Sequence, residues 1–335
     1  MDFNASAYVL TARETLDRME ARDVFLSQNS HLSVKFPVAG LETMLPPVQM
    51  GEVATFGAGS HHGKSLFLKH WVFEAQKALE ESGRRAQIAY ISHEDTGEMI
   101  AQQQVEKYEG NKLQFEDDLF TYIGRSFGMR PEDVAELYMT NIVRALQFAK
   151  DSKFAEPMPF AMIAYDFLQK TPPDPERRKM TTDAQRRLQL ADDSARLGNA
   201  AVYFSCPVIV AAQTGLKKLN TPYSNGSKDQ PAMLIPGDGD FEEAKEIYQY
   251  ADHAYTGWLP FKDYPVGKFI ENGNWNFQVT KDLFFLRHLK SRYCNPNKWK
   301  GIGRVFPLRI QQDGSFVYDP EYHKKIYATP PQEVK

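Results

Sequence analysis

A glycine-rich segment near residue 60 constrains this chain more strongly than any other part of its 335 residues. It lies between a short apolar run and a predicted helix that begins at Lys64 and ends near Gly83. The residues fit the spacing [Ala/Gly]-x-x-x-x-Gly-Lys-[Ser/Thr], which is typical of a loop that binds the phosphates of a nucleotide. Gly59 and Gly63 are expected to let backbone N–H groups turn toward the phosphates, at the positive end of the helix dipole. We therefore predict that the complete loop contacts the nucleotide: Ala58, Gly59, Ser60, His61, His62, Gly63, Lys64 and Ser65.

The side chains of this loop suggest separate roles. Lys64 is predicted to reach the β- and γ-phosphates, and the Ser65 hydroxyl is predicted to bind Mg²⁺. His61 and His62 occupy positions where the pattern accepts any residue, and we interpret them as solvent-facing loop residues rather than metal ligands. Ala58 stands where glycine is commoner, so the flanking strand and helix carry much of the evidence for the motif.

The composition is that of an ordinary globular protein, with 42% hydrophobic and 25% charged residues. The net charge of -3 provides no overall attraction to nucleic acid, so any such binding depends on local basic loops.

The sequence shows neither a secretion signal nor an apolar stretch long enough to span a membrane, and we expect a cytoplasmic protein. Cys206 and Cys294 stand far apart outside any CxxC spacing, and we interpret them as buried or idle thiols in a reducing compartment.

Alternating apolar runs and helical patterns predict a three-layer α/β sandwich with a mainly parallel central sheet. Helices are expected over 97–108, 131–150 and 182–197, the last one opened by a capping box. Beyond the strand that leads into the phosphate loop, strands are expected over 86–92, 119–123, 160–166, 206–212, 252–258, 268–279 (a hairpin), 283–289, 303–310 and 314–318.

The predicted organisation has three parts. Residues 1–32 comprise a short N-terminal helix over 4–26 and a linker, which are expected to dock on their own domain or on a neighbouring subunit. Residues 33–325 form the core domain, and 326–335 are expected to be a loose tail with two prolines.

Polar side chains follow three of the predicted strands. Because ligands bind at the carboxyl ends of parallel strands, these side chains are expected near the phosphate loop. Glu94 is placed to polarise water against the γ-phosphate; Asp95 competes for that role, with a helix N-cap as its alternative. Asp166 is expected to complete the magnesium shell, and Gln213 either senses the γ-phosphate or is a solvated turn residue.

The order of these elements resembles the RecA-like core of the DnaB family of replicative helicases. The resemblance covers about 33–319 and rests on the phosphate loop, on Glu94 and Gln213, and above all on two segments: Asp166-Phe167-Leu168-Gln169 and Lys290-Ser291-Arg292. It implies an ATP- and Mg²⁺-dependent enzyme that forms a ring, usually of six subunits.

The resemblance also implies roles for single residues. Glu94 would be the base that activates water, Asp166 would support magnesium, and Gln213 would couple the γ-phosphate to DNA-binding loops. Lys290 and Arg292 would reach the neighbouring subunit's site and stabilise charge on the γ-phosphoryl group. Without the resemblance, a solvated or ion-paired surface arginine would be the preferred interpretation of Arg292.

Two basic loops are candidates for contacting single-stranded DNA after the strand ends at 166 and 213. A solvated charged loop is an equally good interpretation of each. The residues concerned are Lys170, Arg177, Arg178, Lys179, Lys217 and Lys218.

We expect no counterpart of the family's large N-terminal domain, so primase contacts made through that domain are not carried over; a primase or a loader stays an open partner. A hairpin near 262–280 is additional to the usual core.

We expect a DNA helicase moving on single-stranded DNA, with two alternatives: a RecA-like recombinase that forms filaments, or a ring ATPase that does not translocate. A small-molecule kinase fits poorly, because the sequence offers no acceptor-binding motif.

Overall fold

The strands form a nine-stranded sheet in the computed structural model, with a separate two-stranded hairpin. The structure describes residues 11, 13, 33–107, 120–175, 183–214, 235–237, 240–241, 245–272, 275–292, 294–295 and 298–327. The order across the large sheet is β11-β10-β9-β6-β1-β5-β4-β2-β3. Its strands are β1 (Val53–Ala58), β2 (Gln87–Thr96), β3 (Phe120–Arg125), β4 (Phe160–Asp166), β5 (Val208–Gln213), β6 (His253–Trp258), β9 (Leu283–Ser291), β10 (Val305–Ile310) and β11 (Phe316–Tyr318).

The sheet has a parallel part and an antiparallel part. From β3 through β2, β4, β5 and β1 to β6, each neighbouring pair is parallel, while β9, β10 and β11 continue the sheet in antiparallel pairs. The apolar strands of the parallel part are buried on both faces, as their continuous hydrophobic runs require. The predicted mainly parallel sheet is confirmed.

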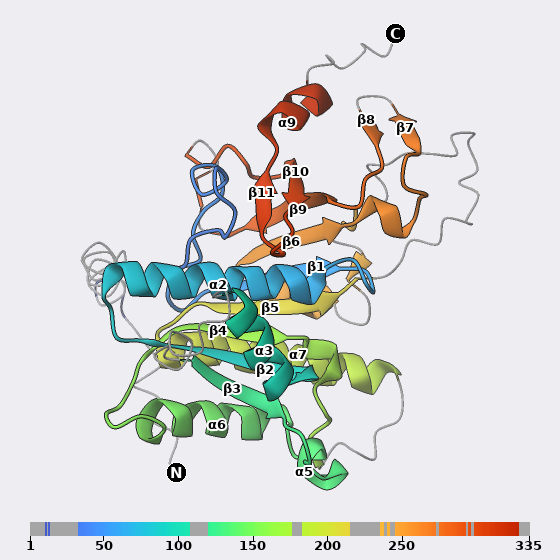
Figure 1. The fold of residues 1–335 in the computed structure, drawn as a ribbon. Coiled ribbons are helices and arrows are strands. Elements are labelled where there is room, and N and C mark those ends of the chain that lie inside the picture. The colour runs from blue at the N-terminus through green and yellow to red at the C-terminus, as the bar shows by residue number, and fades with distance from the viewer. Residues whose placement is uncertain are drawn as a thin grey trace.

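Helices cover both faces of the parallel part, which gives the three predicted layers (Figure 1). Alternate residues of each strand point to opposite faces. In β1, Phe56 packs toward α2 (Lys64–Ser82), whereas Val53 belongs to the core formed with the helices of the other face. The helices are α2, α3 (Gly97–Lys107), α5 (Pro131–Ala135), α6 (Met139–Ser152), α7 (Asp183–Phe204), α8 (Lys245–Tyr250) and α9 (Pro320–Tyr327).

Stacked and edge-on aromatic rings fix α2 against the sheet behind the phosphate loop. The Phe67 ring lies 4.4 Å from Phe56, 6.0 Å from Trp71 and 5.0 Å from Phe316, measured between centroids. The connector before β1 joins this core, since the Trp71 indole donates to the Lys35 carbonyl oxygen at 3.1 Å. The helix that follows the phosphate loop is therefore packed firmly against the apolar core.

The hairpin of β7 (Phe269–Asn272) and β8 (Trp275–Gln278) packs at the antiparallel end of the sheet, and Figure 1 shows it at the upper right of the molecule. The Phe277 ring is buried and lies 5.0 Å from the ring of Phe285 and 6.1 Å from that of Trp258. The predicted hairpin is confirmed, and one consequence of it is a third apolar cluster that covers this end of the sheet.

Several predicted boundaries differ from the structure. The helix expected over 131–150 is two helices, because α5 ends at Ala135 and the chain is extended at Tyr138 before α6 begins. The helix that ends the described chain, α9, was not predicted, and it continues to Tyr327 past the expected boundary at 325. The predicted N-terminal helix over 4–26 falls almost wholly outside the described residues. Within the part of the chain that the structure describes, no helix combines the length and the apolarity needed to cross a membrane.

We predict that the hairpin contributes to stability through its buried ring. Phe277→Ala should lower the free energy of unfolding by about 3–5 kcal/mol, because it empties an aromatic site in the third cluster. Phe269, which is 54% exposed on the same hairpin, is the matched control; Phe269→Ala should change stability by less than about 0.5 kcal/mol. Urea unfolding of both variants checks this, and equal losses would show that the hairpin is not docked as described.

Candidate functional site

The predicted site residues at the strand ends meet at one edge of the sheet. In the parallel register Ala58 lies beside Gln213, and Ser92 lies beside Asp166. Glu94 follows two residues after Ser92 on the same strand. The carboxyl ends of β1, β5, β4 and β2 therefore bring the phosphate loop, both candidate carboxylates and the candidate sensor to the same place.

The phosphate loop turns through two left-handed residues. Gly63 is the N-cap of α2 with φ 82°, and His61 has φ 63°. Gly63 meets the requirement for a residue without a Cβ at this turn. Gly59, the other glycine expected to turn the loop, has no positive φ. No sequence pattern indicated that His61 would adopt this left-handed conformation.

The expectation that both loop histidines face solvent is wrong for His62. His61 is exposed, but His62 is buried and its Nδ1 accepts the Leu259 N–H at 3.2 Å. Burial lowers the pKa of His62, partly offset by Asp263, whose Oδ2 lies 3.9 Å from Nε2. His62 thus ties the phosphate loop to the segment after β6, a role that its place in a variable motif position did not reveal.

Lys64 lies at the centre of the polar cluster. Its Nζ is 3.2 Å from Asp166 Oδ1, 3.4 Å from Ser65 Oγ and 3.9 Å from Glu94 Oε2. The Ser65 hydroxyl donates to the same Asp166 oxygen at 3.1 Å. Asp166 is fully buried, whereas the Glu94 side chain is 42% exposed and so accessible to water. The structure therefore brings together these four predicted residues.

Two aromatic residues that were not assigned roles complete this cluster. The Tyr90 hydroxyl donates to Asp166 Oδ2 at 3.0 Å, and burial together with the charge of Asp166 raises the pKa of Tyr90, which keeps the phenol protonated. The Phe167 ring lies 3.9 Å from Lys64 Nζ, at cation–π distance. A signal for Phe167 existed in the sequence, since it follows Asp166 directly in the diagnostic segment.

Asp95 forms an ion pair that neither of its predicted roles, base or helix N-cap, anticipated. Its Oδ2 pairs with Lys69 of α2 at 2.6 Å, so the carboxylate points along the helix rather than toward Lys64. It is not the N-cap of α3 either, because Thr96 Oγ1 accepts the Met99 N–H. Glu94 is therefore better placed than Asp95 to act beside Lys64.

Gln213 is linked to the Asp166 segment through its backbone. Gln169 accepts the Gln213 N–H at 3.2 Å and donates to the Gln213 carbonyl oxygen at 3.0 Å. Arg186 of α7 donates to the carbonyl oxygens of Gln169 and Thr171, the latter at 3.2 Å. A movement at the end of β5 is thus mechanically connected to the chain that leaves β4.

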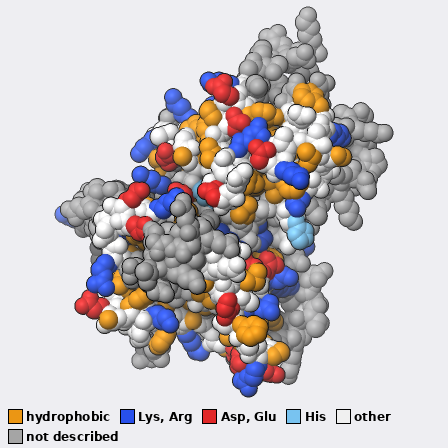
Figure 2. All heavy atoms as spheres, in the orientation of Figure 1, with side chains coloured by type: hydrophobic (Ala, Val, Ile, Leu, Met, Phe, Trp, Pro, Cys, Tyr) orange, Lys and Arg blue, Asp and Glu red, His pale blue; other side chains and the backbone are white. Residues whose placement is uncertain are grey.

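Of the six predicted DNA-binding residues, the structure describes Lys170 alone; Arg177, Arg178, Lys179, Lys217 and Lys218 lie outside the described residues. Lys170 is exposed beside an open pocket of about 370 Å³, which Arg186 also lines. On the face shown in Figure 2, basic and acidic side chains are interspersed among the described residues. The basic loops therefore stay a prediction.

Lys290 and Arg292 lie at the opposite edge of the sheet from the phosphate loop. Strand β9 is antiparallel to β6, so Ser291 pairs with His253 at the beginning of β6. Because His253 pairs with Ala54, four residues before Ala58, the backbone of Lys290 and Arg292 is about 15–20 Å from this chain's own loop.

Both basic side chains contact the end of α8. Lys290 donates to the carbonyl oxygens of Tyr248 and Gln249, and Arg292 donates to that of Gln249. Cations are favourable at a helix C-terminus, where carbonyl groups lack partners within the helix. Burial, together with the charge of Arg292, lowers the pKa of Lys290 to about 8.

The chemistry of the phosphate-loop residues fits ATP with Mg²⁺. Ser65 and Asp166 offer a hydroxyl and a carboxylate, the hard oxygen ligands that Mg²⁺ prefers, at 3.1 Å from each other. The Lys64 ammonium, held between acidic oxygens and the Phe167 ring, has the charge needed to bind phosphate.

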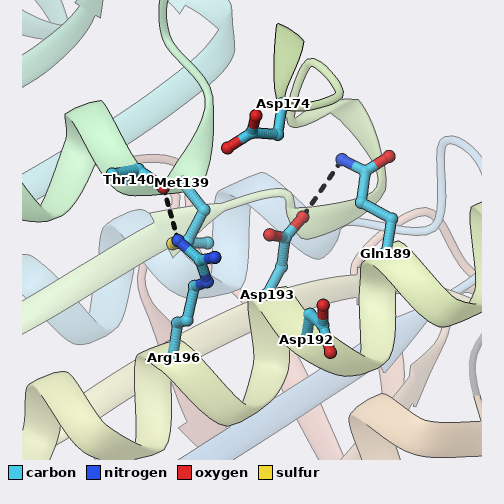
Figure 3. Close-up of a pocket in the computed structure, with 7 residues that line it drawn as sticks. All are labelled: Met139, Thr140, Asp174, Gln189, Asp192, Asp193 and Arg196. Atoms are coloured by element: carbon cyan, nitrogen blue, oxygen red, sulfur yellow. Dashed lines mark hydrogen bonds between the residues drawn. The ribbon is translucent and has the colours of Figure 1, made fainter. Parts of the chain in front are cut away.

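A small pocket of about 10 Å³ lies between α6 and α7, and Figure 3 shows the residues that line it. Asp193 is 6% exposed there, and its Oδ2 accepts a hydrogen bond from Gln189 at 3.2 Å. Burial raises the pKa of Asp193 to about 6. Gln189 also donates to the Pro172 carbonyl oxygen, so this acid supports the chain that leaves β4.

No protein-family model and no curated protein matches this chain in sequence. Its fold is similar to solved structures. The ATPase domain of G40P matches with a TM-score of 0.59 and 14% identity, over 92% of this chain and 98% of that domain. A DnaB-like replicative helicase, described with its interactions with primase, matches with a TM-score of 0.57 and 13% identity, over 85% of this chain and 61% of that helicase. The resemblance to DnaB-like helicases is confirmed at the level of the fold, and the RecA-like fold class with it.

We predict a pH-dependent contribution of Asp193 to stability. Its pKa is raised in the folded state, so the folded protein binds more protons than the unfolded one between about pH 4 and about pH 7, and stability falls as the pH rises through this range. Asp193→Asn cannot ionise, and its stability relative to wild type should increase by up to about 3 kcal/mol from the lower to the higher pH. Urea unfolding at both values, with exposed Glu156→Gln as the control, checks this. A pH-independent difference would contradict it.

Proposed function

We propose that this chain is the motor subunit of an ATP-dependent replicative DNA helicase, a ring that moves along single-stranded DNA and hydrolyses Mg-ATP between neighbouring subunits. The observation that supports it best is the placement of Lys290 and Arg292 at one edge of the sheet and the phosphate loop at the other. A basic pair that cannot reach its own chain's nucleotide is suited to a neighbour's nucleotide.

The residues at the phosphate loop divide the work of ATP hydrolysis. Lys64 would bind the β- and γ-phosphates in place of its contact with Asp166, and Asp166 and Ser65 would hold Mg²⁺. The metal ion neutralises phosphate charge when it is bound. Glu94 accepts a proton from the attacking water as the water oxygen bonds to the γ-phosphorus and ADP leaves. Tyr90 keeps the Asp166 carboxylate oriented through its hydroxyl.

Gln213 and Gln169 provide a route from the nucleotide to DNA in this proposal. A γ-phosphate contact made by Gln213 would move the backbone to which Gln169 is bonded, and with it the chain that carries Lys170. Lys170, together with the predicted basic residues outside the described part, would hold DNA phosphates. The proposed assembly is a hexamer, and we include a primase or a loader among its partners because one similar helicase was described with its primase interactions.

Two other functions are consistent with the same phosphate site. A RecA-like recombinase would form filaments on DNA, and a non-translocating ring ATPase would hydrolyse ATP without responding to DNA. The net charge of -3 and the mixed charges of Figure 2 favour the second of these alternatives. The Lys290 and Arg292 pair, in line with the helicase resemblance, favours the helicase over the recombinase.

We predict that Glu94→Gln separates binding from hydrolysis. Wild-type ATP hydrolysis should rise when single-stranded DNA is added, and the protein should displace a strand from a forked duplex. Glu94→Gln should bind a fluorescent ATP analogue normally but lose hydrolysis by about 10²–10⁴-fold, together with strand displacement, because the base is gone.

Glu132→Gln, which changes an exposed glutamate of α5, is the matched control and should behave as wild type. Undiminished hydrolysis by Glu94→Gln would contradict the assignment of the base. Wild-type hydrolysis that ignores DNA would favour the non-translocating ring over the helicase.

A further inference from the structure

A hydrogen-bonded chain of polar side chains, three of them buried, crosses the edge of the sheet where Lys290 and Arg292 lie. It begins at Glu52, just before β1, whose Oε2 lies 2.9 Å from Nε2 of His253 on β6. Nδ1 of His253 lies 2.9 Å from Oγ of Ser291, the last residue of β9. The same Ser291 oxygen lies 2.7 Å from Nε2 of His288. Side chains from β6, from β9 and from the residue before β1 are thus joined next to Lys290 and Arg292.

The partners at the two ends of this chain fix the direction of its hydrogen bonds. His288 Nδ1 accepts the Gly303 N–H at 3.1 Å, so its Nε2 carries the proton and donates to Ser291 Oγ. At the other end, Glu52 can only accept as a carboxylate, so His253 Nε2 donates to it. The remaining hydrogen bond must then run from the Ser291 hydroxyl to His253 Nδ1.

The rings that hold Ser291 have little freedom. Both His253 and His288 are fully buried, and the Tyr255 ring lies 5.2 Å from that of His288 in an edge-on contact. Burial, together with His253, lowers the pKa of His288 to about 3, so this ring stays neutral near pH 7. Since Ser291 stands between Lys290 and Arg292 in the sequence, two rigid rings set the position from which both cations leave the strand.

The backbone on either side of Ser291 is held in the same way. The Arg292 N–H donates to the Asp252 carbonyl oxygen at 2.7 Å, and the Asp252 carboxylate accepts the Val53 N–H at 2.9 Å. Val53 begins β1, the strand that ends in the phosphate loop. The finger-bearing end of β9 is therefore fixed to the strand that carries this subunit's own nucleotide site.

We propose that Glu52, His253, Ser291 and His288 are positioning residues that fix Lys290 and Arg292 for the neighbouring subunit's nucleotide. This inference rests on the proposed function, since it presumes that the two cations act across an interface. A serine hydrogen-bonded to a histidine, which is in turn hydrogen-bonded to a carboxylate, also occurs in hydrolases that use serine as the nucleophile. Here a second imidazole donates to the same oxygen, which makes that oxygen a poorer nucleophile. The arrangement suits a structural role instead, in which Ser291 holds the end of β9 in place.

The test is a double-mutant cycle on ATP hydrolysis in the complete protein. Arg292→Ala should lower kcat by about 10³-fold. Ser291→Ala should lower kcat by about 10–100-fold, because a misplaced finger loses contact with the transition state, and should leave the KM for ATP unchanged. In the double variant, the loss should equal that of Arg292→Ala alone, since Ser291 acts through the arginine. Ser291→Thr, which keeps the hydroxyl, should restore most of the rate.

Ser194→Ala is the matched control, because this buried α7 hydroxyl donates only to the Leu190 carbonyl oxygen at 2.7 Å among the contacts of the described residues. It should leave kcat unchanged while costing a similar amount of stability, as thermal unfolding of both variants would show. A wild-type kcat for Ser291→Ala, or a further loss in the double variant, would overturn the positioning role. If Arg292→Ala itself hydrolyses ATP normally, the proposed role of Arg292 at the neighbouring nucleotide is wrong. That result differs from one in which only Ser291→Ala behaves as wild type.

Discussion

The ion pair between Lys64 and Asp166 joins the two halves of the proposed nucleotide site, although the residues are 102 positions apart. One belongs to the loop after β1 and the other to the end of β4, which is separated from β1 in the sheet by β5. Their meeting depends on the parallel register, which brings the carboxyl ends of these strands to one edge. A buried carboxylate in this place needs compensation, and Lys64, Ser65 and Tyr90 supply it through hydrogen bonds.

The antiparallel extension of the sheet places the basic pair Lys290 and Arg292 at the edge opposite the phosphate loop. Because β9 runs opposite to β6, its last residues lie at the amino ends of the parallel strands. The same sheet thus has the proposed nucleotide site at one edge and the basic pair at the other. Identical subunits arranged head to tail would bring the second edge of one chain to the first edge of the next, and such heterologous contacts close into rings or continue as filaments.

The sequence predicted the elements of the site better than their contacts. The phosphate loop, Glu94 and Asp166 were predictable because each stands at the end of an apolar strand, and parallel strands present such ends together. The buried place of His62 was not, because its partner Leu259 is almost two hundred residues away along the chain. Asp95 was ambiguous for the same reason, since only the packing of α2 against β2 brings Lys69 to it.

The antiparallel region shows a similar limit. Its hairpins followed from alternating residues and turn signals, but the network around Ser291 joins histidines from two strands whose pairing no local pattern specifies. The third apolar cluster also depends on which face of the sheet the β7–β8 hairpin covers. Tertiary contacts decide these features, and local patterns carry no information about them.

The central claim is that each nucleotide site is completed by the basic pair of the next subunit. The most direct measurement is ATP hydrolysis by a mixture of two inactive proteins, Arg292→Ala and Glu94→Gln. At mixed interfaces, an intact Glu94 from one protein would face an intact Arg292 from the other, and the mixture should recover part of the wild-type rate as its composition approaches equal amounts. A mixture as inactive as its components, in particles shown by light scattering to contain both proteins, would contradict the account.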